Sequence, residues 1–461
     1  MSDCLPQRKS RATTSDYFDL PQELLLEILV RLPIKDVVKS TAVCKSWNSV
    51  IKNPTFISTH LEKTISSTNT RLLLFRICSQ KNPHSFKSDP VEQYSLRFDN
   101  EGVDEYKQLH FPINKFKSAI GCFRVAGSIN GLVCLVDDVS YVHNFYLWNP
   151  IIKKAVHVPT AVHVPRRYHN QKVLIDAFVG FGFDSKMNDY KLLRYVELND
   201  TYPRKEPKVE VEIYSLNANC WRSITHTAPK YDVIFNLPSA YANSFVNGAI
   251  HLLACDRKDG RNRNLILAFD MSEEVFRDIP LPDCWSKNDP VEQKMWSHRK
   301  LLKYGQSIAA VTWEGDDWGR NEIVTLWVMK EYGVAMSWTK ILTEAGERVP
   351  RVLFFRKDEE VFLTIKDGWI ASLDIKNQHS VVFVVHSYES RIVYYPVVDS
   401  FVESLVLLDK GNASWDVILT HEDPSAEDEK GAPRDDASSV DIIQIKKELA
   451  RKSWLLERIG K

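Results

Sequence analysis

The chain has 461 residues, of which 44% are hydrophobic and 26% are charged, and this composition is that of a folded protein rather than a disordered one. Lys plus Arg and Asp plus Glu both total 60, so the formal net charge is zero. Because no overall field favours nucleic acid or an anionic surface, we expect no nucleic-acid partner.

Cysteine usage and the absence of long apolar stretches indicate the compartment. The eight cysteines include no CxxC pair, and several lie in apolar runs such as Leu132–Leu135, which is typical of buried, reduced thiols. Residues 1–16 are polar and predict a disordered tail without the apolar core of a signal peptide. No stretch approaches the roughly 18 uncharged residues that a membrane helix requires. We expect a location in the cytoplasm, the nucleus or both, and no membrane span.

Short apolar patterns at helical spacing follow between residues 17 and 61. The first helix, which ends before Pro33, carries an unusually wide apolar face formed by Leu24, Leu25, Ile28, Leu29 and Leu32. Shorter helices with Val37, Trp47 and Phe56 come next. A segment of this size lies near the lower limit for an independent core, so its surplus of apolar residues needs a second surface to cover it.

These helices closely resemble the F-box motif. The agreement in order and spacing runs through Leu20-Pro21, Glu23, Glu27-Ile28-Leu29, Arg31-Leu32-Pro33, Lys35, Val43-Cys44-Lys45, Trp47, Pro54, Phe56 and His60-Leu61. The resemblance implies a module that binds an adaptor of the Skp family and, through it, a cullin-RING ubiquitin ligase. The residues it implies for adaptor contact are Leu20, Pro21, Leu24, Ile28, Leu32, Pro33 and Val37. Trp47 is expected in the core, and the alternative is a helical cap folded onto the following domain.

From Arg71 onward, short apolar or aromatic runs alternate with clusters of Gly, Pro, Asn and Asp, which is typical of an all-β domain. One tetrapeptide pattern recurs at Leu96–Asp99, Tyr146–Asn149, Tyr214–Asn217, Leu267–Asp270, Leu326–Met329 and Ala371–Asp374. The sequence also supplies tight hairpin turns at Asn130-Gly131, Asn247-Gly248 and Asp367-Gly368.

The spacing of the repeat predicts the architecture. Successive copies are separated by 45 to 68 residues, which suits one four-stranded sheet per unit. Six units predict a six-bladed β-propeller, closed by bringing residues 71–76 beside residues 397–408. Because the spacing is unequal, a β-sandwich, or two of them, is the alternative. The expected fold is therefore mixed, with a small all-α domain followed by an all-β domain.

Residues 127–159 resemble the F-box-associated interaction domain that follows the F-box in a large plant-type family. Other segments that match the same family are Phe178–Asp184, Asp189-Tyr190-Lys191, Phe245–Gly248 and Tyr395–Leu408. The resemblance covers about residues 17–410 and implies an F-box at 17–61 followed by a β domain at 68–415. This family is often called kelch-like, but the chain lacks the repeated Gly-Gly of true kelch units.

The end of the chain changes character twice. Residues 416–441 predict an extended linker, because Glu422–Asp441 holds eight acidic and two basic residues among Pro, Gly, Ser and Ala. Residues 442–461 predict a basic amphipathic helix, whose apolar stripe is Ile442, Ile445, Leu449, Leu456 and Ile459. Its basic residues lie mostly off that stripe and are Lys446, Lys447, Arg451, Lys452, Arg458 and Lys461. Such a helix can dock on the chain itself, lie on a membrane surface or bind a partner, and self-docking is the first of these interpretations.

No spacing in the sequence forces catalytic or metal-binding side chains together, since there is no HExxH, P-loop, GxSxG or zinc-type Cys/His set. His157 and His163 lie in near-duplicate segments and offer a metal pair, but two strand-edge histidines are the simpler interpretation. Cys44 lies beside Lys45 and is interpreted as a packing residue. We expect no metal, no cofactor and no catalytic residue.

A propeller enzyme or a glycan-binding lectin is the rival function. Tryptophans gather near carboxylates in loop-like sequence, at Trp285, Trp296, Trp313 and Trp318 with Asp283, Glu314, Asp316 and Asp317. The same tryptophans can instead fill gaps between blades. An enzyme has no need of an adaptor-binding module, which favours the receptor.

The resemblance to the F-box family implies a non-catalytic substrate receptor of an SCF-type ubiquitin ligase, which would hold a target protein near a ubiquitin carrier. Candidate loops for target capture are residues 161–171, 198–208, 256–264 and 284–298. An F-box scaffold that acts outside a ligase is the remaining alternative, and the sequence does not predict the target.

Overall fold

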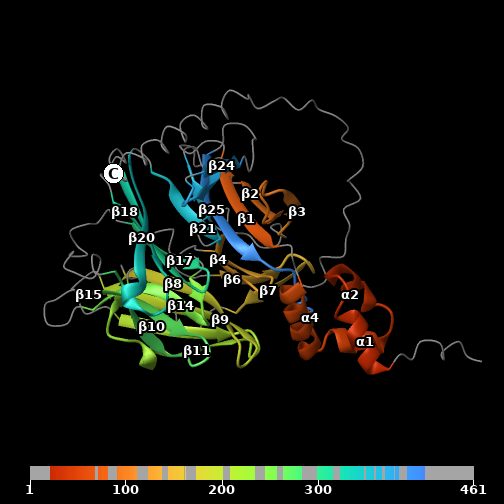
Figure 1. Cartoon of the computed structure of the whole chain (residues 1–461). Coiled ribbons are helices and arrows are strands. Elements are labelled where there is room, and N and C mark those ends of the chain that lie inside the picture. Colours follow the sequence, from red (N-terminus) through yellow and green to blue (C-terminus); the bar gives the residue numbers. More distant parts are fainter. Residues whose placement is uncertain are drawn as a thin grey trace, which may run out of the picture.

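A computed structural model places four helices ahead of six β-sheets in the part of the chain that it describes (Figure 1). It describes residues 21–410 except for the segments 68–70, 81–90, 112–122, 138–143, 160, 162–172, 201–207, 234–243, 257–262, 283–297, 315–321, 347–348, 358–359, 366–368, 378 and 384–391. The helices are α1 (Gln22–Leu29), α2 (Ile34–Ser40), α3 (Lys45–Ile51) and α4 (Pro54–Ser67). None of these helices is long and apolar enough to cross a membrane.

Each sheet is a blade, numbered here in chain order. Blade 1 contains β25 (Ile392–Phe401), β1 (Leu72–Gln80), β2 (Val91–Phe98) and β3 (Glu105–Leu109). Blade 2 contains β4 (Arg124–Ile129), β5 (Leu132–Asp137), β6 (Asn144–Asn149) and β7 (Lys154–Val158). Blade 3 contains β8 (Val173–Asp184), β9 (Asp189–Asp200), β10 (Lys208–Ser215) and β11 (Cys220–Ser223).

Blades 4 to 6 repeat the same antiparallel order. Blade 4 contains β12 (Asp232–Val233), β13 (Phe245–Val246), β14 (Ala249–Asp256), β15 (Arg263–Asp270) and β16 (Phe276–Pro280). Blade 5 contains β17 (His298–Tyr304), β18 (Ser307–Glu314), β19 (Glu322–Met329) and β20 (Trp338–Gly346). Blade 6 contains β21 (Arg351–Lys357), β22 (Glu360–Thr364), β23 (Ile370–Asp374) and β24 (His379–Phe383).

The blades form a closed ring. Strands of neighbouring blades contact one another in the cyclic order β25, β4, β8, β14, β17, β21 and back to β25, and β14 is the second strand of its blade. Closure is achieved by blade 1, where β25 from the end of the described chain pairs with β1 so that Phe75 lies opposite Val398 and Arg76 opposite Val397. The predicted six-bladed propeller and its closure are therefore confirmed, and the β-sandwich alternative is wrong.

The repeated tetrapeptide marks the third strand of every blade, counted from the centre. Its copies lie in or at the end of β2, β6, β10, β15, β19 and β23. In three copies the final Asn or Asp side chain accepts backbone N–H bonds from the two turn residues that follow: Asn149 from Ile151 and Ile152, Asp270 from Ser272 and Glu273, and Asp374 from Lys376 and Asn377. In these three blades the repeat therefore ends in a side-chain-capped turn that leads the third strand into the fourth.

Two of the predicted hairpin turns are confirmed. Asn130 and Gly131 have φ of 52° and 81°, and Asn247 and Gly248 have φ of 50° and 75°. Positive φ at both central residues defines the turn type that joins antiparallel strands with the least strain. The third predicted turn, Asp367-Gly368, lies outside the described residues.

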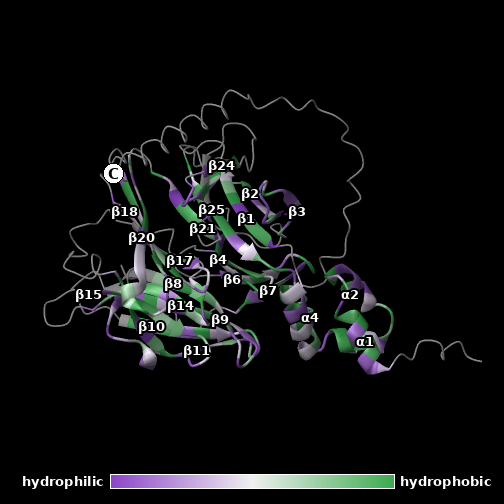
Figure 2. Cartoon of the chain, in the orientation of Figure 1, coloured by the Kyte–Doolittle hydropathy of each residue, from purple (hydrophilic) through white to green (hydrophobic). Residues whose placement is uncertain are grey.

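Apolar packing fills the blades, and the strands carry most of the apolar residues in Figure 2. Tryptophan side chains join neighbouring blades, since the Trp221 indole N–H donates to the Pro159 carbonyl (2.7 Å) and that of Trp338 to the Pro280 carbonyl (2.9 Å). A buried guanidinium group does the same in blade 1: Arg76 pairs with Glu92 at 2.8 Å and also donates to the Phe123 carbonyl of the segment entering blade 2. These bonds satisfy polar groups that burial would otherwise leave unpaired.

We expect protonation of His251 in β14 to destabilise the propeller in acid. Burial lowers the pKa of His251 to about 4, and the neutral ring donates to the Ser244 carbonyl (2.7 Å) and accepts from the Tyr332 hydroxyl (2.7 Å). The folded pKa lies below the ordinary value of 6.5, so the unfolded chain binds the proton first and the stabilisation is lost as pH falls from 6.5 towards 4.

We therefore predict that His251→Asn lowers the free energy of unfolding at pH 7.5. Between pH 7.5 and 4.5, however, the variant should lose roughly 3 kcal/mol less unfolding free energy than the native chain. Urea unfolding of both proteins at several pH values measures this difference. Parallel pH dependences for the variant and the native chain would contradict it.

Candidate functional site

Helix α1 carries apolar side chains on two faces, and only one of them is covered. Leu25 and Leu29 are 5% and 0% exposed in the core of the helical module, whereas Leu24 and Ile28 are 53% and 47% exposed. Val43, between α2 and α3, is 61% exposed. Since complete burial of such a side chain is worth about 1.5–3 kcal/mol, this open surface is suited to binding a partner.

The predicted contact residues do not all lie on this surface. Pro21 and Pro33 flank α1 and are exposed, Leu32 is half-buried, and Leu20 lies outside the described residues. Val37 is fully buried because it follows the buried Ile34 by three positions, on the face of α2 that packs into the module. It is a core residue and not part of the open surface.

Val43 is the surface residue that sequence reasoning missed. Because α2 ends at Ser40 and α3 begins at Lys45, Val43 lies in the connection between them and outside the helical pattern from which the contact residues were predicted. Its neighbour Cys44 is exposed rather than packed, and its Sγ accepts the Trp47 N–H at 3.5 Å as the cap of α3. The interpretation of Cys44 as a packing residue is wrong, whereas Trp47 packs against the core as expected.

Buried His60 fixes the orientation of α1 against α4. Its Nε2 lies 3.0 Å from the Leu32 carbonyl at the end of the α1 turn, and burial lowers the pKa of His60 below its ordinary value. The neutral ring can donate this bond to the carbonyl group in the turn between α1 and α2.

The opposite side of the module is joined to the propeller. Leu61 of α4, Leu132 of β5, Leu192 of β9 and Leu405 belong to one continuous buried apolar cluster. The helical-cap alternative is thus partly met, since α4 does pack on the following domain. The module nevertheless leaves the Leu24 and Ile28 side of α1 open.

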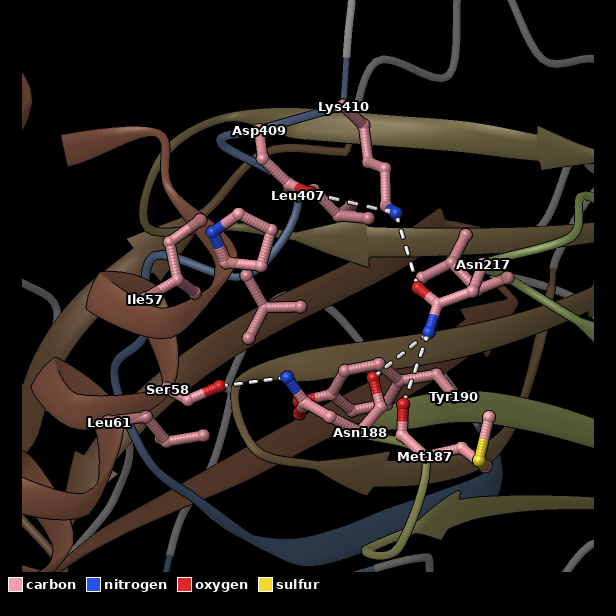
Figure 3. A pocket seen from close by; sticks show the side chains of 13 residues that line it. Ile57, Ser58, Leu61, Met187, Asn188, Tyr190, Asn217, Leu407, Asp409 and Lys410 are labelled. Atoms are coloured by element: carbon pink, nitrogen blue, oxygen red, sulfur yellow. Dashed lines mark hydrogen bonds and ion pairs between the residues drawn. The ribbon is translucent and has the colours of Figure 1, made fainter. Parts of the chain in front are cut away.

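A cavity of about 330 Å³ lies at this junction (Figure 3). Ser58 of α4 accepts a hydrogen bond from the Asn188 amide of blade 3 at 2.8 Å, and the Asn217 amide donates to the Asn188 carbonyl at 3.2 Å. Lys410 lies 3.4 Å from the Asn217 carbonyl oxygen. The polar groups around the cavity therefore bond mainly to one another and tie α4 to blade 3.

The segment Val402–Lys410, here called the strap, runs from the end of β25 into this junction. Buried Asn149 donates to the carbonyl groups of Ser404 (3.0 Å) and Val406 (2.9 Å). At Gly131, where φ is +81°, a Cβ would lie 2.3 Å from the Ser404 hydroxyl and 2.7 Å from the Val402 carbonyl oxygen. The Asn149 hydrogen bonds therefore hold the strap against blade 2, and the absence of a side chain at Gly131 allows the close approach.

One tryptophan of the rival carbohydrate or catalytic site, Trp313, is buried between blades. Trp313 is 5% exposed, its indole N–H donates to the Pro350 carbonyl at 3.1 Å, and the Arg351 guanidinium lies 5.5 Å from its ring centre. It fills the gap between blades 5 and 6 and offers no face to a sugar. The other three tryptophans and Asp283, Asp316 and Asp317 lie outside the described residues.

The remaining candidate residues are only partly described. His157 lies against the Tyr146 ring with 5.1 Å between centroids, and His163 lies outside the described residues. Within the described ranges no group of three His, Cys, Asp or Glu side chains could hold a metal ion. The four candidate target loops lie mostly in segments that the structure does not describe, so target capture there stays a prediction.

Comparison with known proteins agrees with this architecture. Residues 18–59 match the F-box domain, and residues 87–408 match the F-box associated beta propeller domain. The F-box protein At3g07870 of Arabidopsis thaliana is 26% identical over 423 residues, covering 87% of this chain and 90% of that protein. The F-box/kelch-repeat protein At3g23880 of the same plant is 26% identical and covers 84% and 94%. Among solved structures, TolB of Acinetobacter baumannii aligns with a TM-score of 0.39 at 9% identity over 70% of this chain and 66% of that one.

We predict that Asn149→Leu lowers the free energy of unfolding by at least about 3 kcal/mol. The change leaves the strap carbonyls and two turn N–H groups without their partners in a buried site. Denaturant unfolding measures the loss. Asn377→Ala is the control, because this exposed asparagine donates one solvent-accessible side-chain bond to Asp374, and it should lower stability by no more than about 1 kcal/mol. Equal free energies of unfolding for Asn149→Leu and Asn377→Ala would contradict the role of Asn149 in holding the strap.

Proposed function

The chain belongs to the family of F-box proteins with an F-box associated β-propeller domain, and on this premise we propose that it is the substrate-recognition subunit of an SCF-type cullin-RING ubiquitin ligase. In this proposal the F-box binds an adaptor of the Skp family and the propeller binds a target protein.

The open apolar surface of the F-box is the observation that carries the proposal. Leu24 and Ile28 lie one helical turn apart on α1 and are each about half exposed, and exposed Pro21 precedes them on the same face. Val43 adds a third exposed aliphatic side chain. The core positions of the same helix are completely filled, so this second apolar face serves no purpose within the described fold.

The junction supports a positional role. The F-box and the propeller share one apolar core, and Ser58 and Asn188 bond across the boundary. An adaptor held on α1 and a target held on the propeller would then keep a fixed relation to each other. Holding a target lysine near a charged ubiquitin carrier replaces a rare encounter with a high effective concentration, so the receptor itself needs to break no bond.

Target capture and location complete the proposal. The target is a protein bound by loops of the propeller, for which residues 161–171, 198–208, 256–264 and 284–298 are the candidates. The site of action is the cytoplasm, the nucleus or both.

We predict that Leu24→Glu together with Ile28→Glu weakens binding of a Skp-family adaptor on the order of 100-fold, because two apolar contacts of about 1.5 kcal/mol or more each are replaced by desolvated charges. Co-purification and calorimetric titration of the full chain with the adaptor measure the effect. Both side chains are exposed, so the variant should keep its fold.

The matched control is Met336→Glu, which adds a charge at a propeller side chain that is 90% exposed. Adaptor affinity of this control should equal that of the native chain. Undiminished adaptor binding by the α1 variant would contradict the contact surface, and no binding by the native chain would contradict the ligase function.

A further inference from the structure

The F-box has a second open surface, distinct from the Leu24 and Ile28 face. A groove of about 640 Å³ lies between α1, the end of α3 and the start of α4. Its apolar lining is Leu26, Val30, Val50 and Phe56. Leu26, Val30 and Val50 pack against the core with one side and remain partly exposed on the other.

This groove uses a different side of α1 from the proposed adaptor surface. With 3.6 residues per turn, the direction of Leu26 and Val30 differs from that of Leu24 and Ile28 by roughly 160°. A molecule in the groove therefore leaves the Leu24 and Ile28 face free.

The charges at the groove have one sign. Glu23 and Glu27 are its charged lining residues, and no Lys or Arg lines it. Glu27 also pairs with Arg31 at 2.6 Å, but both side chains are about 60% exposed. Such a pair is worth little and can exchange for another cation. The groove thus suits an apolar segment flanked by basic residues.

The chain itself contains such a segment. Residues 442–461, here called the tail, place Ile445 and Leu449 on the apolar stripe of the predicted helix and carry six basic against two acidic residues. We propose that the tail docks in the groove as an amphipathic helix, with its apolar stripe against Leu26, Val30 and Val50 and its lysines beside Glu23 and Glu27.

The described chain ends at the right place for this contact. Lys410 lies at the junction cavity with Pro54 and Ile57 on one face of α4 (Figure 3). The groove is lined by Thr55, Phe56 and Thr59 of the same helix. The two surfaces are therefore separated by about one helix diameter, roughly 10–12 Å.

The intervening segment is long enough. Residues 411–441 connect Lys410 to the tail, and a flexible chain of this length has a root-mean-square span of roughly 30 Å. A tether of this kind presents its end at an effective concentration on the order of 1 mM, so a weak intrinsic affinity suffices for docking. The docking does not depend on adaptor binding.

Hydrogen exchange of the full chain tests the proposal. In the native chain the amides of α1 and the first turn of α4 should exchange slowly, and Ile445→Asp with Leu449→Asp should raise their exchange about tenfold by releasing the tail. The control is Gln444→Asp with Ala450→Asp, which adds the same charge away from the apolar stripe and should have a smaller effect.

Charge variants of the groove test the second contact. Glu23→Gln with Glu27→Gln should weaken docking about three- to tenfold, whereas Glu62→Gln, at an exposed position of α4 outside the groove, should not. The proposal would be overturned if the amide exchange rates of the groove residues were the same in the native chain and in the Ile445→Asp, Leu449→Asp variant. Two other results would also contradict it. The first is slow amide exchange in the tail that requires residues 422–441 or added lipid vesicles instead of the groove. The second is slow amide exchange in the groove that appears only when adaptor is added.

Discussion

The pairing of β25 with β1 is the interaction on which the rest of the structure depends. It joins segments more than three hundred residues apart in the sequence into blade 1 and so closes the ring. Without it, both ends of the sheet array would present unpaired strand edges. Closure also fixes the start of the strap, because the chain leaves β25 at Phe401 and enters the Asn149 contacts within a few residues.

Ring closure thereby positions the F-box. The strap brings Leu405 into the same core as Leu61 of α4, while the next polar contacts at Ser58 and Asn188 lie around the cavity beside it. One side of the helical module is used for this attachment. Two other sides of the module remain accessible on α1. One is the Leu24 and Ile28 face, and the other is the groove lined by Glu23 and Glu27.

The sequence predicted the fold well because its repeat has a local physical cause. The final Asn or Asp of three tetrapeptides caps the turn that follows, so the same local requirement selects a similar residue in those three blades. Six copies of the repeat also predicted that the ring of blades would close. Helical spacing located the apolar positions of α1 and α2 equally well.

The sequence could not say which apolar face would be covered. Val37 and Leu24 have the same chemistry, yet Val37 is buried and Leu24 is open because only the three-dimensional neighbours of α1 and α2 distinguish them. The strap contacts of Asn149 were invisible for the same reason, since its partners are some 255 residues away. Val43 was not among the predicted contact residues because it lies between two helices, where helical spacing does not predict exposure.

A distance measurement between the F-box and the propeller tests the central claim that they form one rigid body. Spin labels at Ser46→Cys in α3 and Met336→Cys in blade 5 report that distance. Cys4, Cys44, Cys122, Cys220 and Cys284 are replaced by serine, so that the remaining native cysteines, Cys78, Cys134 and Cys255, are buried. The account predicts a single narrow distance distribution for the full chain without any partner. A broad distribution, in which the F-box samples many orientations, would contradict it.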